Sequence, residues 1–121
     1  MISLREDFKE LREVNEKDWK LFRQKLPGWQ EAYMDRLNRE YVALLTGEEK
    51  ASDKFWELEK RIRNDKRSVG VVAEMRRSMM YNNLLSLIYD DVIGIDDLDG
   101  FSDELREQIE FVARNRGTES N

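Results

Sequence analysis

The chain has 121 residues, of which 40% are hydrophobic and 39% are charged, and its formal net charge at pH 7 is −5. It contains no histidine and no cysteine, which excludes an imidazole general base, a thiolate nucleophile and a zinc site built from those side chains. The length suits one domain that buries roughly two-thirds of the surface of its unfolded chain.

The hydropathy pattern predicts a soluble protein. The longest uninterrupted apolar run is 69–73, far short of the ~20 residues needed to cross a bilayer. Charged residues at positions 5–7 occupy the place where a signal peptide needs its apolar stretch. Because the chain also lacks cysteine, we expect a reducing compartment and a cytoplasmic location.

The first helical pattern covers residues 4–26 and permits two interpretations. Ser3 and Glu6 form a capping box, and an apolar stripe follows at three- and four-residue spacing. Its members are Leu4, Phe8, Leu11, Trp19, Phe22 and Leu26. Asn15 lies in the same register, either as a polar residue within one long helix or as the N-cap of a second helix, with Val14 stapled to Trp19. We favour the break at Asn15.

Pro27 predicts the end of this segment, because proline disfavours helical geometry at the residue before it. A third helix is expected from Trp29 to Leu45, with Gly47 as its stop signal. Its apolar stripe consists of Tyr33, Leu37, Tyr41 and Leu44. Ser52 is the expected N-cap of a fourth helix, which carries Phe55, Leu58 and Ile62 and frays near Asp65.

A long fifth helix is expected from about Val71 to Ile93, closed by Gly94. Its apolar residues cover more than half of the helix circumference, so more than one neighbour must cover it. Two interpretations stay open: a central core helix wrapped by its own chain, or a helix that is partly an oligomer interface. The candidate self-association face consists of Met80, Tyr81, Leu84, Leu85, Ile88 and Tyr89.

The last part of the chain predicts a short capped turn at 96–100 and a final helix capped by Ser102. That helix presents Leu105, Ile109 and Val112 on one side. The fold class is therefore all-α, a compact single-domain bundle of five to six helices with a long central fifth helix. We expect the helical domain to span residues 1–116 and a flexible tail to span 117–121.

Charge is uneven along the chain. Residues 60–77 carry seven basic side chains against Asp65 and Glu74, whereas residues 78–121 carry three basic and ten acidic side chains. The candidate basic patch consists of Trp56, Lys60, Arg63, Arg67, Arg76 and Arg77. It permits three interpretations: a site for a nucleic-acid backbone or base, a solvated face with a cation–π contact on Trp56, or a surface that docks on the acidic C-terminal region.

Two specific motifs fail on their spacing. In a helix–turn–helix with its turn at Gly70, Lys66 and Arg76 would occupy the positions that pack between the helices, where burial of cations is costly. In a calcium loop with its glycine at Gly100, Arg106 would replace the bidentate glutamate. No phosphate-binding glycine loop or catalytic pair is recognisable, and we expect no cofactor and no metal.

The sequence therefore predicts a non-enzymatic protein–protein interaction or self-association module, with a homodimer favoured, a protein partner as a further option and no membrane contact. The alternative is a nucleic-acid-associated regulator that uses the basic 60–77 patch.

Overall fold

The computed structural model describes residues 14–119, and side chains up to residue 115. Over that range the chain forms four α-helices and two 3-10 helices, without a strand. They are α2 (Glu16–Leu45), α3 (Ala51–Asp65), η1 (Arg77–Met79), α4 (Met80–Tyr89), η2 (Ile95–Leu98) and α5 (Asp103–Glu119). The all-α prediction is confirmed, whereas the predicted five to six helices and the long fifth helix do not match the four helices of this range.

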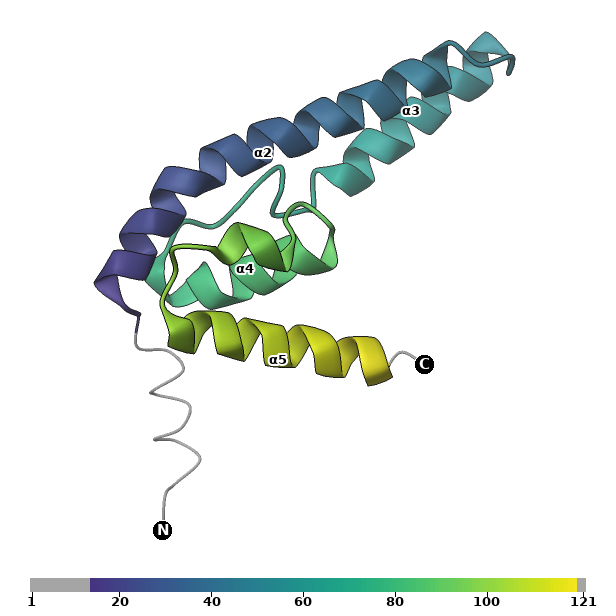
Figure 1. Ribbon diagram of the computed structural model, residues 1–121. Coiled ribbons are helices and arrows are strands. Elements are labelled where there is room, and N and C mark those ends of the chain that lie inside the picture. The colour runs from purple at the N-terminus through teal and green to yellow at the C-terminus, as the bar shows by residue number, and fades with distance from the viewer. Residues whose placement is uncertain (1–13, 120–121) are drawn as a thin grey trace.

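The helices form a small globular part and a protruding arm (Figure 1). α4 lies between the first half of α2 and α5, and the three helices enclose the core. The second half of α2 continues away from this core and pairs with α3, which runs back along it. Arg36 on this half still reaches the globular part, where its Nη2 donates to the carbonyl of Asp91 at 2.8 Å. We call the paired second half of α2 and α3 the arm.

α2 begins directly after Asn15, as predicted by the interpretation that breaks the first helical pattern at this residue. Asn15 is the N-cap, and its Oδ1 accepts hydrogen bonds from the backbone N–H groups of Lys17 at 2.8 Å and Asp18 at 3.3 Å. This satisfies two of the N–H groups that a helix leaves unpaired at its start. Val14 packs against the core. The predicted capping box at Ser3 lies outside the described residues.

The predicted helix end at Pro27 is wrong, because α2 continues through it to Leu45. Proline removes one helical hydrogen bond and crowds the preceding turn, at a cost of about 3 kcal/mol. The carbonyl that loses its partner is that of Arg23; Arg23 is exposed, so this carbonyl can bond water. Leu26 before the proline and Leu37 after it are both buried and lie on one continuous helical stripe. Their packing outweighs the free-energy cost of a proline within the helix.

The ends of the next two segments are close to those predicted. α2 ends at Leu45, and the N–H of Gly47 donates to the carbonyl of Leu44 at 3.3 Å. α3 begins at Ala51, with Lys50 rather than Ser52 at the cap position, and ends at Asp65.

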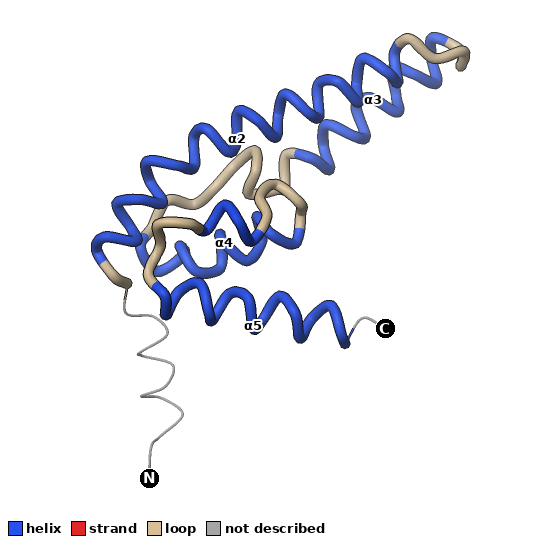
Figure 2. Tube along the Cα trace, viewed as in Figure 1, coloured by secondary structure: helices blue, strands red, loops and turns tan. Residues whose placement is uncertain are grey.

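The predicted long helix from Val71 to Ile93 is wrong, since α4 has only ten residues. Residues 72–76 are irregular, and η1 joins them to α4. Figure 2 shows this segment, in tan, carrying the chain from the end of α3 back towards the start of α2. Asn83 Nδ2 donates to the carbonyl of Glu74 at 3.0 Å, so a side chain of α4 holds the irregular backbone in place.

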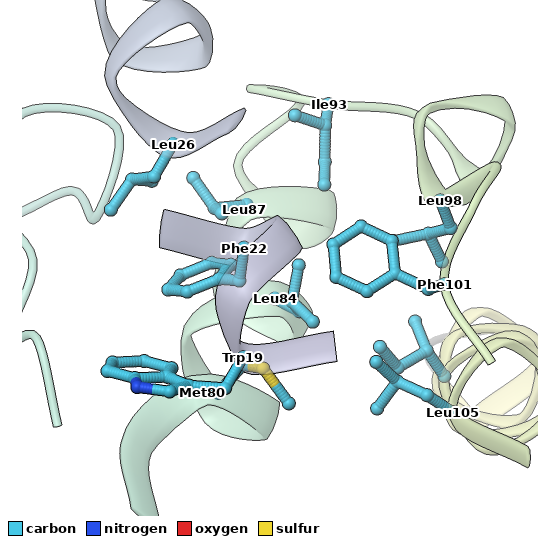
Figure 3. Close-up of a cluster of buried hydrophobic side chains, with 11 residues drawn as sticks. Trp19, Phe22, Leu26, Met80, Leu84, Leu87, Ile93, Leu98, Phe101 and Leu105 are labelled. Carbon is cyan, nitrogen blue, oxygen red and sulfur yellow. The ribbon is translucent and has the colours of Figure 1, made fainter. Parts of the chain in front are cut away.

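Within the described residues, the core cluster draws on the first half of α2, α4, η2, α5 and the loops beside η2 (Figure 3). Phe22, Leu84, Leu87, Leu98 and Ile109 are the largest fully buried side chains. Aromatic rings connect α2 to the loop before α5, with Trp29 lying 6.4 Å from both Phe22 and Phe101 between ring centroids. The apolar side chains of α4 are therefore covered on several sides by other parts of their own chain.

α5 starts at a polar link to α2. Asp18, which is 4% exposed, accepts hydrogen bonds from the backbone N–H of Ser102 at 2.8 Å and from its hydroxyl at 2.6 Å. Ser102 Oγ also accepts from the N–H of Leu105 at 3.3 Å, which confirms it as the N-cap. α5 extends to Glu119, and the domain limit at residue 116 stays a prediction.

None of the helices that the structure describes is both long enough and apolar enough to cross a bilayer.

Two glycines provide a matched test of this packing. A Cβ on Gly70 would lie 2.7 Å from Val92 Cγ2 and would overlap the ring of Tyr33, whereas a Cβ on Gly28 meets nothing within 4 Å. We expect Gly70→Ala to lower the free energy of unfolding by about 1–3 kcal/mol through overpacking. Gly28→Ala, inside a helix, should raise it by about 0.5–1 kcal/mol. Urea denaturation of both variants measures this, and equal effects would contradict the packing described at Gly70.

Candidate interaction surface

The candidate self-association face on α4 is largely internal. Met80 is 3% exposed and Leu84 is fully buried, so neither side chain is available to a partner. Tyr81, Leu85 and Ile88 are half-buried and pack against the core cluster. Burial, and then the charge of Tyr89, raises the pKa of Tyr81. The expectation that Met80 and Leu84 serve as contact residues is therefore wrong: their own chain covers them.

The candidate basic patch is divided between two regions. Trp56, Lys60 and Arg63 lie on α3, and Arg67 follows its end. Arg76 is the N-cap of η1 and Arg77 is its first residue. Arg77 Nε is 3.0 Å from the carboxylate of Glu16.

The separation of these two regions follows from the ion pairs. α3 is held beside Glu40 of α2 by Arg61, whereas Arg77 is held beside Glu16 at the start of the same helix. At 1.5 Å per residue these positions on α2 are roughly 36 Å apart. The structure thus brings together the α3 members of the patch and leaves Arg76 and Arg77 at a distance.

The charged partners of the basic segment lie mainly on α2 and within the segment itself. Arg63 pairs with Glu59 one turn earlier, and Arg76 pairs with Glu74. Trp56 is 65% exposed, and its ring packs edge to face on Phe55 with 5.0 Å between centroids. Contact with the acidic C-terminal region comes from Ser68, whose hydroxyl donates to Asp90 at 3.0 Å.

The aspartates of residues 90–99 have local structural roles. Asp97 accepts a hydrogen bond from the N–H of Gly94 at 2.8 Å and caps η2. Asp91 adopts a positive φ of 58° in the turn after α4. Within the described residues no three acidic side chains come together in a way that could hold a metal ion.

The exposure of the apolar side chains of α3 was not predicted from the sequence. None of its fifteen residues is buried. Its half-buried positions are Lys54, Leu58, Arg61 and Asp65, spaced as one helical face that lies against α2. Phe55 and Ile62 each follow one of these positions by a single residue, which turns them about 100° away around the helix.

Phe55 and Ile62 are exposed, and together with the half-buried Leu58 between them they form what we call the apolar stripe. Phe55 is 61% exposed and Ile62 is 38% exposed. The stripe lines a shallow groove of about 430 Å³, and Glu59, Arg63 and Lys66 form the charged part of its lining. Val42 and Leu45, near the tip of the arm, are also exposed, at 59% and 44%.

The stripe carried a signal in the sequence. The positions 55, 58 and 62 are helically spaced, and the predicted fourth helix carries all three apolar residues. What the sequence could not give is the rotation of α3 about its axis, which depends on the polar contacts with α2.

Those polar contacts join Arg61, Glu40, Tyr41 and Asp65. Arg61 Nη2 lies 2.8 Å from Glu40 Oε1, and its guanidinium stands over the Tyr41 ring at 5.5 Å from the centroid. The hydroxyl of Tyr41 donates to the carboxylate of Asp65. The hydrogen bond with Glu40 is the main cause of the raised pKa of Arg61, and cation–π and charge-assisted contacts of this kind fix the facing sides of two helices.

Chemically, this surface offers apolar area flanked by charges of both signs. Comparison of the chain with known protein families, with curated proteins and with solved structures finds no match. The geometry of the arm is therefore the basis for inferring a function.

Titration of Tyr41 tests the contact that orients α3. Burial, and then the hydrogen bond to Asp65, raises the pKa of Tyr41 from 10.0 to about 12. Since the folded protein favours the protonated phenol, this contribution to stability is complete below pH 10 and is lost as the pH rises from 10 to about 12. The phenolate absorbance of the wild type minus that of Tyr41→Phe should show a midpoint near pH 12. A midpoint near pH 10 would contradict the contact.

Proposed function

We propose that this protein is a non-enzymatic helical module that self-associates through the apolar stripe of α3. The observation that carries the proposal is the orientation of α3, a helix without a buried residue on which Phe55 and Ile62 lie about 100° around from the half-buried face that packs on α2.

Two features distinguish the stripe from ordinary scattered surface residues. Its members are adjacent on one helix and line a common groove, whereas isolated exposed apolar residues need no explanation. The groove also lies on an arm that extends away from the core, so a second molecule can approach it without displacing any part of the fold.

The energetic gain is of the right order for a dimer. Complete burial of a phenylalanine or isoleucine side chain contributes about 1.5–3 kcal/mol. In a symmetric pair each such contact occurs twice. The exposed fractions of Phe55 and Ile62 leave much of this gain unused in the single chain.

A second candidate function, binding of nucleic acid, is supported by the exposed Trp56 beside the cations of α3. An aromatic ring next to Lys60 and Arg63 suits a phosphate backbone with unstacked bases. The distance to Arg76 and Arg77 and the overall charge of −5 make this candidate the weaker one.

A salt-titrated binding assay with single-stranded oligonucleotide tests this alternative. Binding through the α3 cations should weaken steeply as salt rises and should be abolished by Arg63→Glu combined with Arg67→Glu. No measurable binding at low salt rejects the nucleic-acid function.

Self-association is tested by light scattering after size exclusion over a range of protein concentrations. The wild-type mass should rise from 14.5 kDa towards twice that value. Phe55→Ser should raise the dimer dissociation constant at least about tenfold, because each dimer loses two apolar contacts.

The matched control is Phe111→Ser on α5, since Phe111 is 66% exposed and Phe55 is 61% exposed. This variant should dimerise like the wild type. A constant mass of 14.5 kDa at high concentration, or an equal effect of the two substitutions, would overturn the proposal.

A further inference from the structure

The charges around the apolar stripe are separated along the chain. Residues 48–59, the connection into α3 and its first part, carry five acidic and two basic side chains. Residues 60–67, which follow directly, carry five basic side chains and one acidic side chain. The stripe spans the boundary, with Phe55 on the acidic side and Ile62 on the basic side.

We propose that two copies of this chain pair α3 against α3 in antiparallel orientation, around a two-fold axis near Leu58 and Glu59. In this arrangement Phe55 of one copy lies beside Ile62 of the other, and the net-acidic segment 48–59 of each copy runs alongside the net-basic segment 60–67 of its partner. The inference rests on the proposed self-association and adds its partner surface and its orientation.

The charge pattern selects between the two ways of aligning the helices. A parallel pair would place the basic segments 60–67 of both copies side by side, and like charges in register are unfavourable. The antiparallel pair removes this repulsion and replaces it with attraction at both ends. Complementary charges of this kind act mainly on orientation and association rate.

Symmetry makes the pairing self-limiting. A two-fold arrangement uses the same surface on both copies, so it closes as a dimer and does not propagate into a filament. The stripe is suited to this use, because Phe55 and Ile62 lie at equal distances along the helix on either side of the proposed axis and exchange places on rotation by 180°.

The structure leaves room for the second copy. α3 contacts its own α2 through Lys54, Leu58, Arg61 and Asp65, and the neighbouring face with Glu59 and Lys66 lies in the open groove. Because the arm projects beyond the globular part (Figure 1), two arms can lie side by side and form a four-helix arrangement.

Disulfide cross-linking tests the geometry directly, since the chain contains no cysteine of its own. Glu59→Cys places a thiol in the groove near the proposed axis, and we expect oxidation to convert most of the protein into a covalent dimer. Glu57→Cys is the matched control: it is exposed on the same helix but lies about 200° around from residue 59, and should cross-link at background level.

A charge reversal tests the orientation. Lys66 lines the groove whereas Lys60 does not, and both are exposed. Lys66→Glu should raise the dimer dissociation constant about tenfold, because in each dimer two attractive contacts become repulsive. Lys60→Glu, with the same change in net charge, should have a clearly smaller effect.

The outcomes separate the two proposals. A wild-type protein that stays monomeric overturns the self-association proposal itself. A dimer in which Glu57→Cys cross-links as well as Glu59→Cys, or in which Lys60→Glu and Lys66→Glu act alike, preserves self-association but overturns the antiparallel α3 pairing.

Discussion

The continuity of α2 through Pro27 is the constraint on which the rest of the structure depends. The part before the proline supplies Trp19, Phe22 and Leu26 to the core, and the part after it holds α3 through Glu40 and Tyr41. A break at Pro27 would leave the arm attached to the globular part only through side contacts such as Arg36 with the carbonyl of Asp91 and Tyr33 with Gly70. Because the helix continues, the position of the arm is set by the packing of the core, and a surface outside the core is held in a defined orientation.

The buried carboxylate of Asp18 anchors the other end of this arrangement. It lies in the first turn of α2, where a negative charge is favourable, and it binds both the N–H and the hydroxyl of Ser102 at the start of α5. Asp18 thus lies in the first turn of α2 and also binds the N-cap residue of α5, Ser102, which is 84 residues away in sequence. An unpaired carboxylate at this depth would be costly, so α2 and α5 must meet at this point for the core to close.

The sequence predicts local features well where the deciding contacts are close in the chain. The caps at Asn15 and Ser102 and the helix ends at Leu45 and Asp65 were predictable from side-chain hydrogen bonding and from glycine signals. The prediction of a helix end at Pro27 was wrong because the rule that proline disfavours a helix considers only neighbouring residues. The apolar stripe from Leu26 to Leu37 continues in helical register past the proline. The prediction of a long fifth helix failed because residues 72–76 are irregular and their backbone is held by Asn83 of α4, a contact that helical periodicity does not reveal.

The apolar face of α4 is largely internal because a high apolar content predicts burial within the chain as well as contact with a partner. α4 has the most apolar sequence of the described helices, and for that reason its own chain surrounds it. α3 is more polar, and the contacts of Arg61 and Asp65 with α2 use the face that a core helix would fill with apolar residues. Phe55 and Ile62 are consequently turned to the side, where none of the residues that the structure describes buries them. Polar contacts inside one chain thus set which apolar side chains of α3 stay exposed.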